Sequence, residues 1–402
     1  MFHRTHTIHQ FARRKTPKFS TGLTAIASNR LITMFGSSLF GLFFPIFLYQ
    51  MFNDSVLYML LFFLIGYTAG ALAHPIGAKI MTRIGLNASI ILGTISYIFF
   101  WASFLLVTED IAKLGGIILA IIFLTIWRIL YWVPFHTDFA QFTKKGTRGR
   151  VIGSFASLGL LIGVITPLLS GFLISSFGYP VLFIAACAII TTSLFPLLFL
   201  PKVKEEYSYG YFETFKVLFE KRHRSMIYTY ASEGAENVVG LFIWPIFLFQ
   251  ILKGNYLDVG MLATAIVIAS IILQLLVGRW TDKYRRRSIL KIGTGLYSLG
   301  WIFKVFVTTA FQIFIVATYH SFAMIIMRTP FDAMLYERAA DAGHYVDEYT
   351  VLREVALNIG RVIMILLLLL TLTFVSLPYT FFLAAISALF LNFIGKKTEW
   401  KS

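Results

Sequence analysis

Two glutamates and an asparagine lie close together within an otherwise apolar stretch of the chain. Glu233, Glu236 and Asn237 fall within about 100° of a helix circumference, so one helical face would carry all three. A carboxyl group in a low-dielectric environment can take up and release a proton near neutral pH. We therefore expect Glu233 and Glu236 to be sites of proton coupling. The alternative is that Glu233 is solvated at a helix end or forms a salt bridge with Arg30 or Arg361.

Other ionisable side chains also lie in apolar segments, where a charge at a helix centre costs about 2.5 to 3.5 kcal/mol and needs a partner or a function. Arg328 has Asp332 four residues later on the same helical face, which permits an ion pair within one helix. A cavity-facing role in binding or coupling is the alternative for both residues. Glu354, Asn358 and Arg361 follow at i, i+4 and i+7, and they form one polar stripe that must face protein or water.

The composition indicates that these residues belong to a membrane protein. Of 402 residues, 58% are hydrophobic and only 13% are charged, which is too much apolar surface for a soluble fold of this length. With about 20 apolar residues for each crossing, the sequence predicts an all-α polytopic fold with twelve transmembrane helices. They are expected over residues 22–50, 56–78, 87–107, 116–140, 151–175, 180–200, 226–251, 258–279, 288–309, 311–337, 349–375 and 378–395.

The basic residues are distributed unevenly around these spans. If the spans alternate in direction, 28 of the 35 Lys and Arg residues fall on one side and only Lys113 and Lys253 on the other. Such an excess of basic residues is typical of the cytoplasmic side, so we expect both termini there. It also explains the net charge of +16 without a nucleic-acid partner. Five basic residues remain within the spans: Arg30, Arg128, Lys304, Arg328 and Arg361. For Lys304 we expect an ion pair or a snorkelling side chain.

Several classes of site find no support in the sequence. The single cysteine, Cys187, lies in an apolar run, which excludes a disulfide framework and a cysteine-based metal site. No HExxH, GxSxG or Walker pattern occurs. We therefore expect neither an enzyme nor a protein that binds a cofactor or a metal ion.

The chain contains an internal repeat with an offset of 200 residues. The hexapeptide PIFLYQ at residues 45–50 recurs as PIFLFQ at residues 245–250, and Arg128 matches Arg328. The polar interruption from Pro201 to Arg224 would separate two parallel halves of six helices each. The expected organisation is a basic cytoplasmic tail over residues 1–21, an N-terminal half over 22–200, an amphipathic cytoplasmic connector over 201–225, a C-terminal half over 226–395 and a cytoplasmic tail over 396–402.

A charged stretch between two apolar segments, GRWTDKYRRR, resembles the G-x-L-a-D-R-x-G-R-[KR] loop of the major facilitator superfamily of transporters. The matching residues are Gly278, Asp282, Lys283, Arg286 and Arg287. The corresponding stretch of the first half keeps Arg83 and Gly85 but has Thr82 in place of the aspartate. Arg148 and Arg150, followed by Gly153, resemble the entry to the fifth helix of the same family. The resemblance implies that these residues form a cytoplasmic gate, and that Asp282→Asn impairs transport far more than a change at Thr82.

The resemblance also implies a substrate path between the two halves, lined by the first, fourth, seventh and tenth helices. The side chains expected to line this transport cavity are Arg30, Arg128, Asn237, Arg328, Asn358 and Arg361. The side chains expected to carry protons are Glu233, Glu236 and Asp332.

On this basis we expect a secondary active transporter that moves a small organic solute by alternating access. The stretch TPLLSG at residues 166–171 resembles a relaxed form of the antiporter motif G-P-x-x-G-G, which favours proton-coupled export of an amphiphilic or drug-like compound, although its small residues also suit close helix packing. The alternatives are uptake or facilitated transport of an anionic or zwitterionic metabolite, which the excess of intramembrane cations favours, and a non-transporting membrane sensor or assembly protein on the same fold. The expected partners are a small-molecule substrate, protons and membrane lipids, with no nucleic acid, for a monomer in the cytoplasmic (plasma) membrane.

Overall fold

The computed structural model describes residues 19–108, 112–142, 148–201, 206–281, 286–341 and 346–395. Within these ranges the chain forms helices joined by short loops, and no β-strand occurs. The all-α fold that the composition predicts is confirmed for this part of the chain.

The first half of the chain and the connector contribute nine α-helices and one 3-10 turn. They are α1 (Phe19–Ser38), α2 (Phe43–Met51), α3 (Val56–Ile84), α4 (Leu86–Thr108), α5 (Lys113–Phe142), α6 (Arg148–Phe177), α7 (Tyr179–Thr192), α8 (Leu194–Leu197), α9 (Tyr211–Leu218) and η1 (Lys221–His223).

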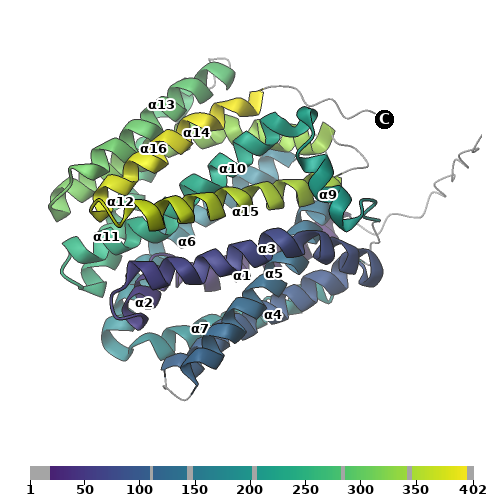
Figure 1. Ribbon diagram of the computed structural model, residues 1–402, viewed down its shortest axis with the longest axis horizontal. Coiled ribbons are helices and arrows are strands. Elements are labelled where there is room, and N and C mark those ends of the chain that lie inside the picture. The colour runs from purple at the N-terminus through teal and green to yellow at the C-terminus, as the bar shows by residue number, and fades with distance from the viewer. Residues whose placement is uncertain are drawn as a thin grey trace, which may run out of the picture.

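The second half repeats this pattern of long helices. Its elements are α10 (Arg224–Val238), the π-helical segment η2 (Val239–Ile243), α11 (Trp244–Ile251), α12 (Tyr256–Thr281), α13 (Arg286–Val305), α14 (Ala310–Asp341), α15 (Val346–Thr371), η4 (Leu377–Thr380), α16 (Phe381–Phe390) and η5 (Leu391–Gly395). The long helices run side by side in one bundle, with α2 and α11 at one end and α9 at the other (Figure 1).

The number of spans agrees with a twelve-helix arrangement. Ten helical stretches in the described ranges are long and apolar enough to cross a membrane, and the pair α1 and α2, bent by 45°, raises the number to 11. The remaining predicted span, over residues 288–309, coincides with α13. This helix is less apolar because it carries Lys291 and Lys304 as well as two arginines in its first turn.

Two helix breaks occur at related positions of the internal repeat. A short turn separates α1 from α2, and the π-helical segment η2 separates α10 from α11. Pro45 lies near the start of α2 and Pro245 near the start of α11. A proline removes one backbone N–H and clashes with the carbonyl group four residues earlier, so each proline disturbs the helix directly before it.

The two halves approach each other most closely where α6 packs against α12. A Cβ atom on Gly260 would lie only 2.4 Å from the carbonyl oxygen of Pro167, and one on Gly171 only 2.5 Å from a carbonyl oxygen of α12. Thr264 Oγ1 donates a hydrogen bond across the same contact to the carbonyl oxygen of Val164 at 2.9 Å. The small residues of the antiporter-like stretch therefore serve close helix packing.

Further contacts join the halves at the end of the bundle that carries α2 and α11. Gln250 Nε2 donates a hydrogen bond to the Tyr49 hydroxyl at 3.2 Å, so the two copies of the repeated hexapeptide touch each other. Phe63 of α3 stacks on Phe242 of η2 with ring centroids 3.7 Å apart. Together with the packing of α15 against α3 and α5, these contacts place side chains of α3, α5, η2 and α15 at the boundary between the halves.

Candidate functional site

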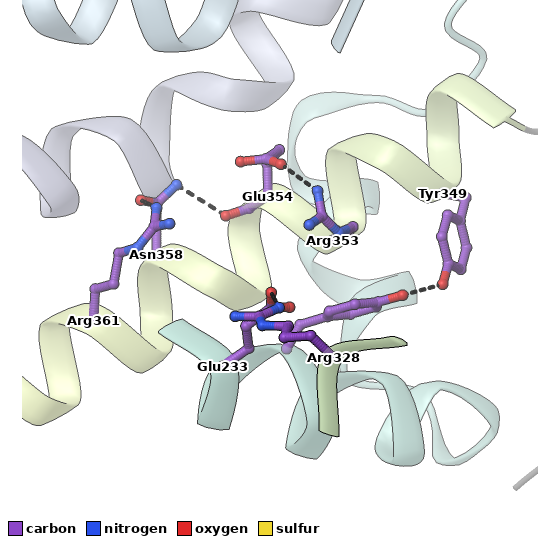
Figure 2. A network of polar contacts seen from close by, with 8 residues as sticks. Glu233, Arg328, Tyr349, Arg353, Glu354, Asn358 and Arg361 are labelled. Carbon is purple, nitrogen blue, oxygen red and sulfur yellow. Dashed lines mark hydrogen bonds and ion pairs between the residues drawn. The ribbon is translucent and has the colours of Figure 1, made fainter. Parts of the chain in front are cut away.

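The acidic face of α10 begins with Glu233, which is buried with 5% of its surface exposed. Arg328 of α14 donates through Nη1 to Glu233 Oε1 at 2.6 Å (Figure 2). Asp332 Oδ1 lies 3.9 Å from the same nitrogen. The sequence interpretation offered Asp332 as the partner of Arg328, and Arg30 or Arg361 as a partner of Glu233. The pair of Arg328 with Asp332 is present at 3.9 Å, but Glu233 lies nearer to Arg328, and Glu233 pairs with Arg328 instead of Arg30 or Arg361. Because Glu233 is buried and the Asp332 side chain is 47% exposed, Glu233 gains more from a charge-assisted hydrogen bond.

Glu236 lies one turn further along α10 in a different environment. It is 3% exposed and accepts a hydrogen bond from the hydroxyl of Tyr297 on α13. It forms no salt bridge with any residue in the described ranges. The sequence predicts the same role for both glutamates. In the structure, Glu233 pairs with the guanidinium group of Arg328, whereas Glu236 is hydrogen-bonded to the phenol of Tyr297.

The polar stripe on α15 forms a chain of contacts that faces α3. Arg353 Nη1 donates to Glu354 Oε1 at 2.8 Å, Asn358 Nδ2 donates to the Glu354 carbonyl at 2.9 Å, and Arg361 Nη1 donates to Asn358 Oδ1 at 3.1 Å (Figure 2). A Cβ atom on Gly70 of α3 would lie 3.7 Å from Asn358 Nδ2. The stripe thus faces protein across the boundary between the halves. This placement is expected, because charged and polar side chains are unfavourable in contact with lipid.

Two arginines from opposite halves approach one aromatic ring. The guanidinium carbon of Arg128 lies 4.1 Å from the ring centroid of Tyr67, and that of Arg361 lies 4.9 Å from it. Neither arginine forms a salt bridge with a residue in the described ranges, and Arg128 Nη1 is buried without a hydrogen bond. The surroundings of Tyr67 therefore carry an excess of positive charge.

The remaining predicted cavity residues lie apart from these groups. The guanidinium carbon of Arg30 lies 4.8 Å from the Trp132 ring and 5.9 Å from the Phe135 ring, both of α5, so its contacts stay within the first half. Asn237 is partly buried on α10 and makes no hydrogen bond with the described residues. The structure brings Arg128 together with Arg361, and Glu233 with Arg328, but it shows no direct contact between Arg30 and the acidic face of α10.

A cavity of about 370 Å³ lies between the halves, towards the end of the bundle that carries α2 and α11. Its wall includes side chains of α1, α2, α6, α11, α12, α13 and α14, among them Ser38, Thr166, Trp244, Lys304, His320 and Ser321. The sequence interpretation assigned Lys304 to an ion pair or a snorkelling role. Lys304 is in fact only 3% exposed, and its Nζ lies 4.1 Å and 3.9 Å from the ring centroids of Trp244 and Trp301. The spacing of Trp301 and Lys304, three residues apart on one helix, was a signal that could have indicated this contact.

Most of the predicted cytoplasmic gate lies outside the part of the chain that can be described. Asp282 and Lys283 fall outside the described residues. The backbones of Arg148 and Arg150 belong to the first turn of α6 and that of Arg286 to the first turn of α13, but the side chains of these three arginines are also outside the described part. The backbone of Gly278 belongs to α12. Arg83 and Arg287 are exposed at the ends of α3 and α13. Gly85 ends α3 with φ of 85°, a conformation that favours glycine.

The connector forms contacts with both halves that the sequence did not indicate. The backbone N–H of Tyr207 donates to Thr82 Oγ1 at 3.0 Å, and its carbonyl accepts a hydrogen bond from Lys79 Nζ at 3.1 Å, both on α3. The backbone N–H of Ser208 donates to Glu348 Oε1 of α15 at 3.1 Å. Burial raises the pKa of the Tyr207 phenol above its usual range, so this group stays neutral beside Thr214. Thr82, which stands where the family signature has an aspartate, thus anchors the connector.

A comparison with protein families agrees with this two-half architecture. The profile of the Major Facilitator Superfamily matches the chain twice, over residues 26–232 and residues 226–396. This chain belongs to the major facilitator superfamily. It is therefore a multi-pass membrane protein of a transporter family, as the loop resemblance implied. It is also similar to the uncharacterized protein YqgE of Bacillus subtilis (strain 168), with 28% identity over 319 residues that cover 76% of this chain and 70% of that protein.

The family assignment makes the boundary between the halves the candidate site of transport. Among the described residues, no group of three or more His, Cys, Asp or Glu side chains is arranged to hold a metal ion. The chemistry available at the boundary is thus that of carboxyl groups, guanidinium groups, one ammonium group and aromatic rings.

Proposed function

We propose that this protein is a proton-coupled secondary transporter that moves a small amphiphilic organic solute between its two halves by alternating access. The observation that carries the proposal is Glu236, a carboxyl group that is 3% exposed and has no salt bridge within the described ranges. Burying a carboxylate without a paired cation is costly, whereas a protonated carboxyl group carries no charge into the interior. Glu236 is therefore suited to bind a proton in one state of the transport cycle and to release it in another.

The position of Glu236 connects the proton with the solute cavity. Gly240, one turn later, lines the cavity, and a Cβ atom on it would lie 3.8 Å from Glu236 Oε1. The charged neighbours of Glu236 are Arg328, Lys304 and Glu233. Loss of the proton would strengthen the attraction of Glu236 for the two cations. Proton release would thus draw α10 towards α13 and α14 and change the wall of the cavity.

We further propose export as the direction of transport, as the antiporter-like stretch suggests. Uptake of an anionic or zwitterionic metabolite is the second candidate. It is favoured by Arg128 and Arg361, which lie over Tyr67 and form no salt bridge with a described residue. Two guanidinium groups without carboxylate partners can bind a carboxylate or a phosphate of a solute. Asn358, whose Oδ1 accepts a hydrogen bond from Arg361, would add a neutral polar group to such a site.

The organisation proposed for this cycle follows the predicted boundaries. The halves over residues 22–200 and 226–395 would rock about the boundary, with the connector, both tails and the gate around Asp282 on the cytoplasmic side. We propose that the protein works as a monomer in the cytoplasmic membrane. The distribution of 28 basic residues on one side supports this orientation.

Reconstitution into liposomes tests the proposed function. A panel of amphiphilic carboxylates, amines and neutral compounds is offered with an imposed pH gradient and without one. We expect gradient-dependent movement of at least one class by the wild type, loss of this movement in Glu236→Gln, and normal movement by the control Glu206→Gln, whose side chain is exposed in the connector. Equal movement without a gradient and with Glu236 replaced would exclude proton coupling. No movement of any class would favour a sensor or assembly protein.

A further inference from the structure

Lys304 is a buried lysine to which the family resemblance assigns no role in solute binding. It lies on α13, is 3% exposed, and forms no salt bridge or hydrogen bond with any described residue. Its ammonium group is instead placed between the indole rings of Trp244 and Trp301, at 4.1 Å and 3.9 Å from their centroids. Cation–π contacts stabilise an ammonium group, but they leave its capacity to donate hydrogen bonds unused.

The nearest carboxyl group is not a hydrogen-bond acceptor for the Lys304 ammonium group. Glu236 is a charged neighbour of Lys304, but it accepts its hydrogen bond from the hydroxyl of Tyr297 and not from the ammonium group. His320 packs on the other side of the same aromatic cluster, with its ring centroid 4.6 Å from that of Trp301. The protein thus holds the Lys304 charge in position within an aromatic cluster, without a partner of opposite charge at contact distance among the described residues.

Lys304 lines the cavity of about 370 Å³ between the halves. This volume lies within the range of about 300 to 1,000 Å³ that is usual for sites of small organic ligands. No Asp or Glu is among the residues that line the cavity, and Lys304 is its only Lys or Arg. The rest of the wall is largely apolar and includes Leu42, Phe43, Leu248 and Ile266.

Hydroxyl groups from both halves complete the polar part of the wall. Ser38 of α1 and Ser321 of α14 line the cavity, and neither side chain makes a hydrogen bond with a described residue. Thr166 also lines the cavity, but its hydroxyl donates to the Ile162 carbonyl at 2.9 Å and so can only accept from a ligand. The wall therefore offers the Lys304 ammonium group, two available hydroxyl donors, the His320 imidazole and a large apolar surface.

We propose that this cavity binds an amphiphilic organic monoanion, with its anionic group at Lys304 Nζ and its apolar body against α2, α11 and α12. The assignment rests on the proposed function, in which a solute enters between the halves, and it specifies the class of that solute. A single ammonium group in a largely apolar wall favours a ligand with one negative charge and a hydrophobic body, and it disfavours organic cations by charge repulsion. The occupant is a free organic acid and not the headgroup of an anionic lipid.

Binding of three naphthalene probes to the purified full-length protein tests this assignment. The probes are 2-naphthoate, the neutral 2-naphthylmethanol and the cationic 2-naphthylmethylammonium, and binding is measured in phosphatidylcholine nanodiscs by calorimetry and by quenching of tryptophan fluorescence. We expect the wild type to bind 2-naphthoate and to bind the alcohol and the ammonium compound at least about tenfold more weakly, because a hydrogen-bonded charge pair contributes a factor of this size.

The variants localise the binding. Lys304→Gln should weaken 2-naphthoate binding about ten- to a hundredfold, Lys304→Arg should retain most of it, and Lys253→Gln, which removes an exposed lysine outside the cavity, should leave it unchanged. No binding of 2-naphthoate at millimolar concentration, or equal binding of all three probes by the wild type, would overturn the assignment even if the Lys304 variants fail to fold. Unchanged binding by a folded Lys304→Gln protein would overturn it as well.

Further measurements distinguish a bound lipid from a free solute, and a failure of the Lys304 site from a failure of the proposed function. Displacement of 2-naphthoate by phosphatidylglycerol in the nanodisc would show that a lipid headgroup occupies the site and would overturn the assignment to a free solute. Solute-dependent proton movement that is lost in Glu236→Gln but is unaffected in Lys304→Gln would retain the proposed function and contradict only the Lys304 site. Binding of 2-naphthoate at Lys304 without any proton movement would contradict only the proton coupling.

Discussion

Glu233 and Arg328 form a salt bridge at 2.6 Å between α10 and α14, and this contact joins two helices of the second half. Glu236, one turn away from Glu233, bonds instead to the hydroxyl of Tyr297. The same helix face thus carries a carboxylate with a fixed counter-charge and a carboxyl group without one among the described residues. We therefore expect a mainly structural role for Glu233, whereas Glu236 is the proposed proton site.

The salt bridge between Glu233 and Arg328 should contribute strongly to stability. Glu233→Gln leaves a largely buried guanidinium group without its nearest partner, so we expect a loss of about 3 to 5 kcal/mol, measured as thermal or denaturant unfolding in detergent. Asp332→Asn is the matched control, because its carboxylate lies 3.9 Å from Arg328 and is 47% exposed, and it should cost less than about 1 kcal/mol. Equal losses from the two replacements would show that Arg328 relies on both carboxylates alike.

The connector should become locally less stable when its hydrogen bond to Thr82 of α3 is removed. Thr82→Val deletes the oxygen that accepts the hydrogen bond from the Tyr207 backbone, so the backbone of residues 206–218 should exchange its amide hydrogens faster, with a local loss of about 1 to 2 kcal/mol. Hydrogen–deuterium exchange with mass spectrometry measures this. Thr308→Val, which changes an exposed threonine near the start of α14, should leave the connector unchanged. Identical exchange in the wild type and Thr82→Val would exclude the anchoring role.

The prediction that Asp282→Asn impairs transport more than a change at Thr82 is separate from this one. It concerns the rate of transport, whereas the anchoring of the connector concerns local stability. Transport assays of Asp282→Asn and Thr82→Val side by side check it, and a larger loss of transport in Thr82→Val would mean that the connector controls the cytoplasmic gate.

The contact between α6 and α12 should tolerate no side chain at Gly260. In Gly260→Ala the added Cβ would lie 2.4 Å from the Pro167 carbonyl oxygen, so the halves must separate and we expect a loss of more than about 2 kcal/mol. Gly295→Ala on α13 is the control, since nothing lies within 4 Å of a Cβ at this position. There the replacement should stabilise the helix slightly, because alanine has the higher helix propensity. Thermal unfolding of the two variants in detergent compares them, and equal melting temperatures would contradict the close contact.

The positions of the helices were predictable because membrane helices follow from local sequence alone. Apolar runs of about 20 residues give the spans. The breaks before α2 and α11 were not predicted, since residues 22–50 and 226–251 are each expected from the sequence as one helix. The partners of the charged side chains were less predictable. Arg328 and Asp332 share a helical face, so the sequence suggests their pairing, but the nearer partner Glu233 comes from a helix that is 95 residues away in the chain.

The environment of Lys304 illustrates the same limit. A lysine near the end of a membrane helix usually extends towards water, and no local feature of the sequence excludes this for Lys304. Its ammonium group is buried because Trp244 of α11 and Trp301 of α13 meet around it. The proximity of these two tryptophans depends on how the helices pack. This packing cannot be derived from the sequence pattern of α13 alone.

The most direct test of the central claim is solute-driven proton movement through Glu236. Proteoliposomes that contain a trapped pH-sensitive dye receive a transported solute, and the change of internal pH is recorded for the wild type, Glu236→Gln and the exposed control Glu206→Gln. The account predicts solute-dependent proton movement in the wild type and in Glu206→Gln, and none in Glu236→Gln, although that variant remains folded and still binds the solute. Proton movement by Glu236→Gln at the rate of the wild type would contradict it.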